Sequence, residues 1–288
     1  LSDTTTTPMR FGGPPTWTPD GVLPESGTLG QGDNFCLVDA GEDPTFLVGG
    51  VTANYGGNFR IGSGRHVVVE GDEYDTAYFD KGPKFLHYRA RTALFTSLEF
   101  DHADIYRDMA HYEGAFEQFC RTMPEDGFLG VSASYPRAVE LARQDARCRV
   151  LTYAVNGKAD YRADNESFTA EGARFLIHTP ERGKLPLTLP MSGYHNLENA
   201  AGVYAAASAL GLSHEQIVRG FATFKGVKRR QEIRADIGGI VVMDDFAHHP
   251  TAVRETIEGI RQRWPERRLW AAAVRVTDVT SMVISVKT

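Results

Sequence analysis

The sequence has few cysteines and no long apolar run, and both absences exclude classes of protein. Its 288 residues include three cysteines, Cys36, Cys120 and Cys148, which are far apart and form no CxxC pair. This number and spacing argue against a disulfide framework and a structural zinc site, and favour a reducing compartment. There is no stretch of about 18 apolar residues, so we expect no contact with a membrane. The opening residues LSDTTTTPMRFGG lack the basic and apolar regions of a secretory signal, so the sequence predicts a cytoplasmic protein.

An excess of basic charge is also missing. With 31 Lys and Arg against 37 Asp and Glu, the formal net charge is −6. General affinity for nucleic acids comes from neutralising phosphates, so we do not expect nucleic acid as a partner. Hydrophobic residues make up 42% and charged residues 24%, as in ordinary globular proteins, and the length suggests about two domains.

Residues 1–34 differ from the remainder of the chain. They contain a run of four threonines, five prolines between Pro8 and Pro24, and many glycines, with no sustained apolar period. Such a composition is typical of loops or disorder, so this segment is predicted to be disordered.

From Phe35 onward the pattern alternates between strands and helices. Short apolar runs predict strands at 66–70, 91–98, 128–133, 149–155, 240–246 and 269–274; helical spacing predicts helices at 108–121, 136–143, 195–210, 213–224 and 250–264. Residues 160–190 alternate weakly, which suggests a hairpin. This order predicts an α/β fold with a mostly parallel sheet covered by helices. The basic stretch at 225–230 divides a first domain, 35–228, from a second, shorter α/β unit at 229–288.

Acidic residues follow two of the predicted buried strands. Glu70 opens the sequence EGDEYD, and the next strand ends in SLEFDHADIY, which contains Glu99 and His102. Parallel sheets bind ligands beyond the carboxyl ends of their strands, and Mg²⁺ prefers carboxylate and phosphate oxygens. These clusters therefore indicate a metal site, although a solvated acidic turn and a structural histidine explain the residues as well.

Three further motifs could bind a nucleotide. His195 and Asn199 are four residues apart in SGYHNLENAAG and share one helix face, where they could contact the edge of a purine. Arg230, in FKGVKRRQE, could contact phosphate through its planar guanidinium group. Asp245, in DDFAHHP, could accept hydrogen bonds from ribose hydroxyls. The alternatives are a helix cap with solvated side chains for the first motif and a solvated basic linker for the second.

Taken in order, these five motifs resemble those of the Mur ligases of peptidoglycan synthesis. The resemblance covers about residues 35–272, and the stretches 46–64 and 80–106 resemble in particular the branch that joins UDP-N-acetylmuramate to a recycled murein tripeptide. It implies a P-loop-type central ATPase domain followed by the start of a truncated, Rossmann-like C-terminal domain. It also implies an ATP- and Mg²⁺-dependent amide ligase that works through an acyl phosphate.

The resemblance assigns roles to individual residues. Glu70 and His102 would each hold one Mg²⁺ and so form the catalytic centre, while His195 and Asn199 would border the adenine. Arg230 would reach phosphate and Asp245 would bind ribose. Many Mur ligases also carry a carbamylated lysine after the histidine motif; here the region reads HYEGAFEQF, and Glu117 would supply the negative charge.

The sequence departs from the family pattern near both of its ends. The family's phosphate loop, of the type GTxGKTTT, is echoed only by LSDTTTTP, which lacks the loop glycines and the lysine. The UDP-binding domain is missing, and the resemblance to the C-terminal domain stops after LWAA. The resemblance therefore implies a ligase by family whose activity we expect to be lost in this chain, and the alternative is an inactive fragment that retains only weak nucleotide binding.

Overall fold

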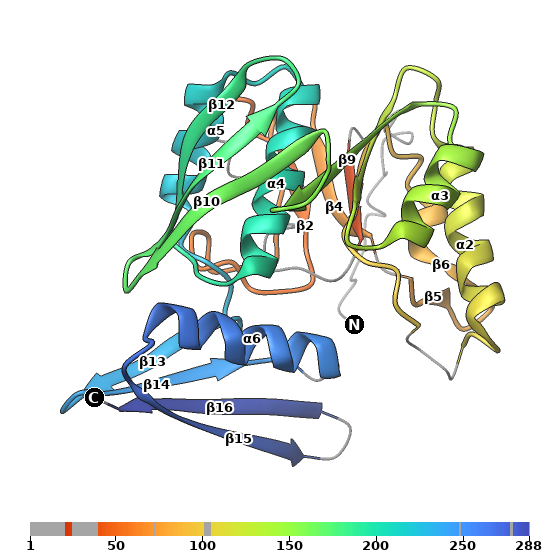
Figure 1. Cartoon of the computed structure of the whole chain (residues 1–288). Coiled ribbons are helices and arrows are strands. Elements are labelled where there is room, and N and C mark those ends of the chain that lie inside the picture. The colour runs from red at the N-terminus through yellow and green to blue at the C-terminus, as the bar shows by residue number, and fades with distance from the viewer. Residues whose placement is uncertain are drawn as a thin grey trace, which may run out of the picture.

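The computed structural model describes residues 21–24, 40–71, 73–100, 105–247, 249–276 and 279–287. Apart from the short strand β1 (Gly21–Pro24), the segment predicted to be disordered lies outside the described residues. The described chain forms a large sheet with helices on both faces and a second, smaller sheet covered by one helix (Figure 1).

The large sheet has ten strands, and its central strands are all parallel. Their order is β12-β11-β10-β9-β8-β7-β1-β4-β2-β3. The strands are β2 (Thr45–Leu47), β3 (Phe59–Arg60), β4 (Val67–Gly71), β7 (Thr92–Phe95), β8 (Phe128–Ser132), β9 (Arg149–Val155), β10 (Tyr161–Thr169), β11 (Gly172–Thr179) and β12 (Gly183–Leu189). The seven strands that lie between β10 and β2 in this order, both included, pair in parallel. Strands β11 and β12 at one edge and β3 at the other pair antiparallel to their neighbours. The predicted mostly parallel α/β sheet is confirmed.

Helices cover both faces because the central strands are apolar on both sides. Every residue of β7 and β8 is buried. On one face Phe95 packs in a cluster with α2 (Met109–Thr122) and α3 (Pro136–Asp145). On the other face Leu94 packs with α4 (Tyr194–Ala209) and α5 (His214–Thr223). Among the described residues, no helix is long and apolar enough to cross a membrane.

Local sequence explains where these helices begin and how closely they pack. The Asp108 side chain accepts a hydrogen bond from the backbone N–H of His111 at 2.8 Å and so caps α2. At the start of α5, Ser213 forms a capping box with Gln216. Gly202 lets α4 approach β9, since a Cβ there would lie 2.9 Å from the Tyr153 ring.

The smaller sheet contains the predicted strand–helix–strand order and two additional strands, one preceding and one following it in the chain. Its order is β13-β14-β16-β15, formed by β13 (Glu232–Ile237), β14 (Ile240–Asp245), β15 (Arg268–Val276) and β16 (Val279–Lys287). Helix α6 (Pro250–Arg263) packs on it through a small cluster that includes Met243 and Ile260. The sequence analysis predicted β14, α6 and β15 but not β16, which lies between β14 and β15 and runs antiparallel to both.

A short hairpin and a 3₁₀ helix follow β4 in the chain and lie near α2 (Figure 1). Strands β5 (Asp75–Ala77) and β6 (Asp80–Pro83) form a hairpin, and the 3₁₀ helix η1 (Lys84–His87) follows it. Strand β6 and η1 lie in the stretch 80–106 that resembles the tripeptide branch of the family, and β5 precedes it.

Candidate functional site

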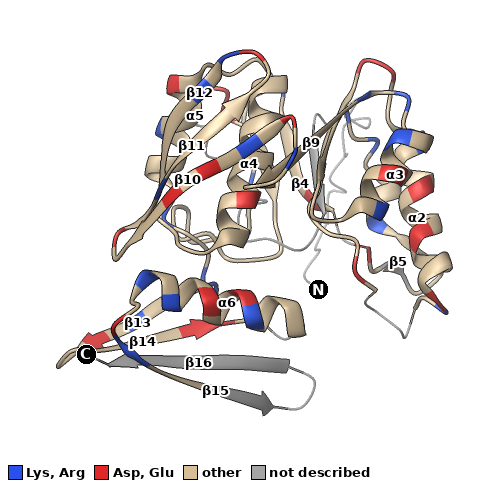
Figure 2. Cartoon of the chain, viewed as in Figure 1, with Lys and Arg blue, Asp and Glu red and all other residues tan. Residues whose placement is uncertain are grey.

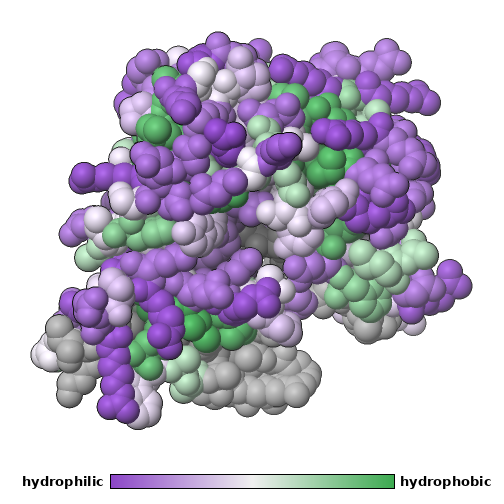
Figure 3. Space-filling view, viewed as in Figure 1, coloured by the Kyte–Doolittle hydropathy of each residue, from purple (hydrophilic) through white to green (hydrophobic). Residues whose placement is uncertain are grey.

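The large sheet with its helices and the smaller sheet with α6 form two units. A cavity of about 360 Å³ lies where these two units meet, and the surface is hollowed there (Figure 3). Most of the residues that line it follow the carboxyl ends of β7, β8 and β14 or belong to the first two turns of α4 and α6; Glu73, Tyr112 and Arg230 complete the lining. This is the edge at which parallel α/β sheets bind ligands. Its size is within the range of small-molecule sites.

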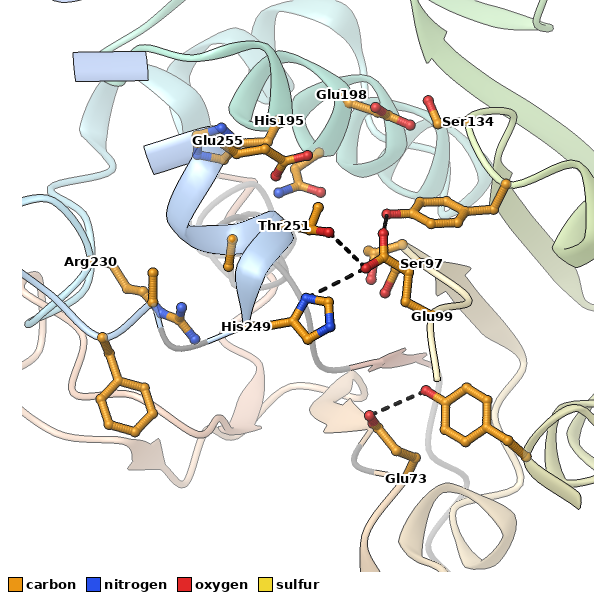
Figure 4. Close-up of a pocket in the computed structure, with 17 residues that line it drawn as sticks. Glu73, Ser97, Glu99, Ser134, His195, Glu198, Arg230, His249, Thr251 and Glu255 are labelled. Atoms are coloured by element: carbon orange, nitrogen blue, oxygen red, sulfur yellow. Dashed lines mark hydrogen bonds and ion pairs between the residues drawn. The ribbon is translucent and has the colours of Figure 1, made fainter. Parts of the chain in front are cut away.

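Glu99 connects the two units across this cavity. Its carboxylate accepts a hydrogen bond from the Tyr135 hydroxyl at 3.0 Å on the large unit and from the Thr251 hydroxyl at 2.9 Å on α6 (Figure 4). The Nδ1 atom of His249 lies 3.5 Å from the same carboxylate. Glu99 therefore helps to hold α6 over the edge of the large sheet.

The side of the cavity around Glu99 is acidic. Glu73, Glu99, Glu198 and Glu255 all line it. Burial raises the pKa of Glu255, and the nearby carboxylates of Glu198 and Glu99 raise it further. Glu73 is buried and accepts a hydrogen bond from the Tyr112 hydroxyl at 3.4 Å. An anion entering this side would need a counter-ion.

The first turn of α4 brings His195 and Asn199 to the cavity, as their spacing predicted. Burial, together with the charge of Arg230, lowers the pKa of His195 to about 4, so the imidazole is neutral at pH 7. Glu198, on the same turn, accepts a hydrogen bond from the Ser132 hydroxyl. This turn therefore offers neutral polar groups beside one carboxylate.

Two glycines allow α6 to approach the start of α4. A Cβ on Gly259 would lie 3.1 Å from the Cα of Gly193, and a Cβ on Gly193 would lie 2.6 Å from the His195 ring. Gly193 also has a φ of +106°, a backbone conformation that favours glycine. The close approach fixes both the contact between the units and the place of His195.

Arg230 lies opposite the acidic side, on the segment that joins the two units (Figure 4). Its neighbours Arg229 and Gln231 both have left-handed backbone, with φ of +59° and +48°. Such conformations are costly in residues other than glycine and cluster at functional sites. The guanidinium carbons of Arg229 and Arg230 lie 4.9 and 5.9 Å from the ring of Phe246, which also lines the cavity.

Asp245 lies beside the cavity but not among the residues that line it. It is 3% exposed, and its carboxylate accepts hydrogen bonds from the backbone N–H groups of Gln231 and Ala247, both at 2.8 Å. Burial raises the pKa of Asp245, and the two backbone hydrogen bonds oppose this. In this structure Asp245 fixes the linker to the end of β14; contact with ribose stays a prediction.

The described residues do not test the predicted metal pair, and it stays a prediction. Glu70 is the penultimate residue of β4, where its carboxylate accepts a hydrogen bond from the backbone N–H of Gly49 at 2.5 Å, and it does not line the cavity. His102 lies outside the described residues. The part of the chain that is described contains no group of three or more His, Cys, Asp or Glu suited to a metal ion. Glu117 forms an ion pair with Arg121 at 3.3 Å, away from the cavity lining.

Comparison with known proteins identifies the family. The model of the Mur ligase middle domain matches residues 64–207, half of the chain, and that of the Mur ligase glutamate ligase domain matches residues 229–279. The chain belongs to the Mur ligase family.

Its relatives within the family have different substrates in their names. UDP-N-acetylmuramate–L-alanine ligase of Salinibacter ruber is 35% identical over 237 residues, which are 82% of this chain and 48% of the relative. UDP-N-acetylmuramate–L-alanyl-gamma-D-glutamyl-meso-2,6-diaminoheptandioate ligase of Haemophilus influenzae is 33% identical over 251 residues, which are 84% and 54%. The chain thus spans about half the length of the curated relatives it matches.

Solved structures support the same family. A murein peptide ligase from Psychrobacter arcticus matches with a TM-score of 0.68 and 30% identity over 86% of this chain and 55% of that one. UDP-N-acetylmuramate–alanine ligase from Thermotoga maritima matches with a TM-score of 0.73 over 88% and 56%. At 24% identity, the second match shows the fold alone.

The sequence analysis missed several side chains of this Mur ligase cavity. Tyr135, Glu198, Thr251 and Glu255 line it, but none was a candidate. A usable signal existed for two of them. Glu198 lies three residues after His195 and so shares its helix face. Glu255 lies four residues after Thr251 and shares a face with it in the same way. The role of Thr251 depends on how the units dock, which no local pattern encodes.

Proposed function

We propose that this chain belongs to an ATP-dependent amide ligase of peptidoglycan metabolism and that the cavity between its units binds the nucleotide. The observation that carries the proposal is the convergence of His195, Asn199 and Arg230 on that one cavity. A neutral imidazole and an amide can pair with the edge of a purine, and a guanidinium group can contact phosphate.

The proposed reaction has two steps. The γ-phosphoryl group of ATP is transferred to a substrate carboxylate, which gives ADP and an acyl phosphate. An amine then attacks the acyl carbon, forms the amide and releases phosphate, with the amine proton passing to solvent or a base. Arg230 would stabilise the charge on the transferred group, because phosphoryl transfer depends mainly on positioning and electrostatic stabilisation.

Magnesium is part of the proposal because of the charge of the cavity. A triphosphate would enter beside Glu73, Glu99, Glu198 and Glu255, and bound Mg²⁺ would neutralise its phosphoryl oxygens. Assignment of Mg²⁺ to Glu70 and His102 follows the family resemblance and remains a prediction, as does ribose binding by Asp245.

The proposed substrates are UDP-N-acetylmuramate and a murein tripeptide. Two stretches, 46–64 and 80–106, resemble the tripeptide branch, and the Haemophilus influenzae relative is named for that tripeptide, whereas the Salinibacter ruber relative is named for L-alanine. We also propose domains at 35–228 and 229–288, because that boundary falls between α5 and β13, where one sheet unit gives way to the next.

A product assay tests this function. The chain is incubated with Mg-ATP, UDP-N-acetylmuramate and either the tripeptide or L-alanine, and ADP and the amide product are measured by mass spectrometry. A working ligase gives product with the tripeptide, and in it Asn199→Ala should raise the KM for ATP at least about tenfold through loss of the proposed contact to the base. Gln144→Ala, an exposed amide on α3, is the matched control.

The outcomes separate the ligase from its alternative. Product with L-alanine alone would contradict the tripeptide proposal but keep the ligase. Nucleotide binding without ADP or amide formation would contradict the ligase and favour the fragment that retains only nucleotide affinity.

A further inference from the structure

A second cavity, of about 400 Å³, lies next to the nucleotide cavity and shares Arg230 with it. It is lined by the segment that follows β12, by the linker at 225–231, by the start of β13 and by Arg263 at the end of α6. We propose that this linker cavity binds a diphosphate group.

The linker cavity is strongly basic. Four cationic side chains line it, Lys225, Lys228, Arg230 and Arg263, against the single carboxylate of Glu232. Figure 2 shows the basic residues on the linker and at the end of α6 in a chain whose overall charge is −6. A concentration of one sign of charge in a concave site attracts a ligand of the opposite sign.

The one carboxylate does not neutralise these cations. Glu232 accepts hydrogen bonds from the backbone N–H of Arg229 and from Nη1 of Arg234, both at 2.9 Å. Burial acts to raise the pKa of Glu232, but these contacts and the charges of Arg234 and Lys228 lower it overall. Within the part of the chain that the structure describes, neither Lys225 nor Lys228 forms an ion pair with a carboxylate. The lysines are therefore available to a ligand.

Arg263 brings a partly buried guanidinium group to the same cavity. Its Nε donates to the carbonyl oxygen of Ala170 at 2.8 Å, and its guanidinium carbon lies 4.5 Å from the Trp264 ring. Only one of the five N–H donors of Arg263 is used in this hydrogen bond, and its acceptor is a backbone carbonyl rather than a carboxylate. Burial lowers the pKa of Arg263 and the nearby charge of Glu171 opposes this, as expected for a cation whose charge is only partly compensated.

The linker backbone is fixed before any ligand arrives. Three hydrogen bonds join the linker to residues 51–54. The backbone N–H of Lys225 donates to Oδ1 of Asn54 at 2.8 Å. The backbone N–H of Ala53 donates to the carbonyl of Gly226 at 3.0 Å, and that of Lys228 donates to the carbonyl of Val51 at 2.9 Å. A preformed arrangement reduces the ordering cost of binding. The linker thus presents Lys225 and Lys228 from a rigid frame.

The charge and size of the site point to a diphosphate. Four cations and one anion leave an excess of three positive charges, more than one carboxylate would balance. The planar guanidinium group of arginine can donate two parallel hydrogen bonds to phosphate oxygens, and lysine ammonium groups add positive charge around them. A volume of about 400 Å³ accommodates the diphosphate of a larger molecule as well as the free ion.

Calorimetric titration of the chain with inorganic pyrophosphate, without Mg²⁺, tests the proposal. We expect Lys225→Gln and Lys228→Gln each to weaken binding about tenfold, because each removes a charge-assisted contact. Both lysines are exposed, so the variants should fold. Lys184→Gln, which removes the same charge from an exposed position on β12, should change the affinity less than about twofold. UDP in place of pyrophosphate distinguishes the source: tighter binding with the same lysine dependence assigns a nucleotide-borne diphosphate, and weaker binding assigns the free ion.

Three results would overturn the linker site. The first is no binding at millimolar pyrophosphate, and the second is an equal loss of pyrophosphate affinity in Lys184→Gln. The third is a loss of pyrophosphate affinity in Asn199→Ala, which would show that the anion binds in the nucleotide cavity. The site stands independently of the proposed ligase. If Mg-ATP fails to bind but pyrophosphate binding depends on Lys225 and Lys228, the ligase proposal fails and the linker site remains.

Discussion

His195 should make the chain less stable in mild acid by a defined amount. Burial and Arg230 hold the pKa of this imidazole at about 4 in the folded state, against an ordinary value of 6.5. Because the unfolded chain takes up the proton first, the stabilisation is complete above pH 6.5 and is lost as the pH falls towards 4. The full loss is about 3 kcal/mol, of which about 2 kcal/mol falls between pH 7 and pH 5.

Urea unfolding of the chain and of His195→Gln at pH 7 and pH 5 measures this term. Other groups titrate in both proteins, so their contributions cancel in the difference between the two. We expect the free energy of unfolding of the unmodified chain to fall by about 2 kcal/mol more than that of His195→Gln. NMR titration of the imidazole, assigned by its disappearance in the variant, gives the pKa directly. Equal losses in both proteins, or an imidazole that titrates near 6.5, would refute the reasoning.

Two further predictions concern packing and the contact between the units. Gly202→Ala should lower the free energy of unfolding by about 1–3 kcal/mol, because the new Cβ would lie 2.9 Å from the Tyr153 ring. The control is Gly114→Ala, in α2 with open space around it, which should leave the free energy of unfolding unchanged or raise it. Equal effects of the two substitutions in urea unfolding would contradict this account of the packing. Thr251→Val should cost about 1 kcal/mol by removing the 2.9 Å hydrogen bond to Glu99, whereas Thr251→Ser should retain it; identical unfolding curves for the two variants would show that the contact contributes nothing.

Much of the large unit could be predicted from the sequence because its signals are local. Strands such as β8 are continuous apolar runs, and helices such as α5 follow from the helical spacing of their apolar residues. The same patterns placed His195, Asn199 and Arg230 as candidates, and all three line one cavity.

What could not be predicted depends on contacts between distant segments. Glu99 was a candidate only for metal binding, yet it accepts a hydrogen bond from Thr251, which lies 152 residues away. Strand β16 pairs with both β14 and β15, and an apolar pattern at 279–287 does not reveal its partners. Asp245 was assigned to ribose from its place at a strand end, but its backbone contacts to Gln231 and Ala247 appear only when the linker folds back.

The most direct test of the nucleotide site is the equilibrium affinity of the chain for Mg-ATP, measured by calorimetry. We expect a dissociation constant below about 100 µM, weakened at least about tenfold both in Asn199→Ala, which removes the amide proposed to contact the base, and in Arg230→Ala, which removes the proposed phosphate contact. Gln144→Ala should bind as the unmodified chain does. Absence of binding at millimolar Mg-ATP, or an affinity that neither cavity substitution changes, would contradict the assignment of the cavity to the nucleotide.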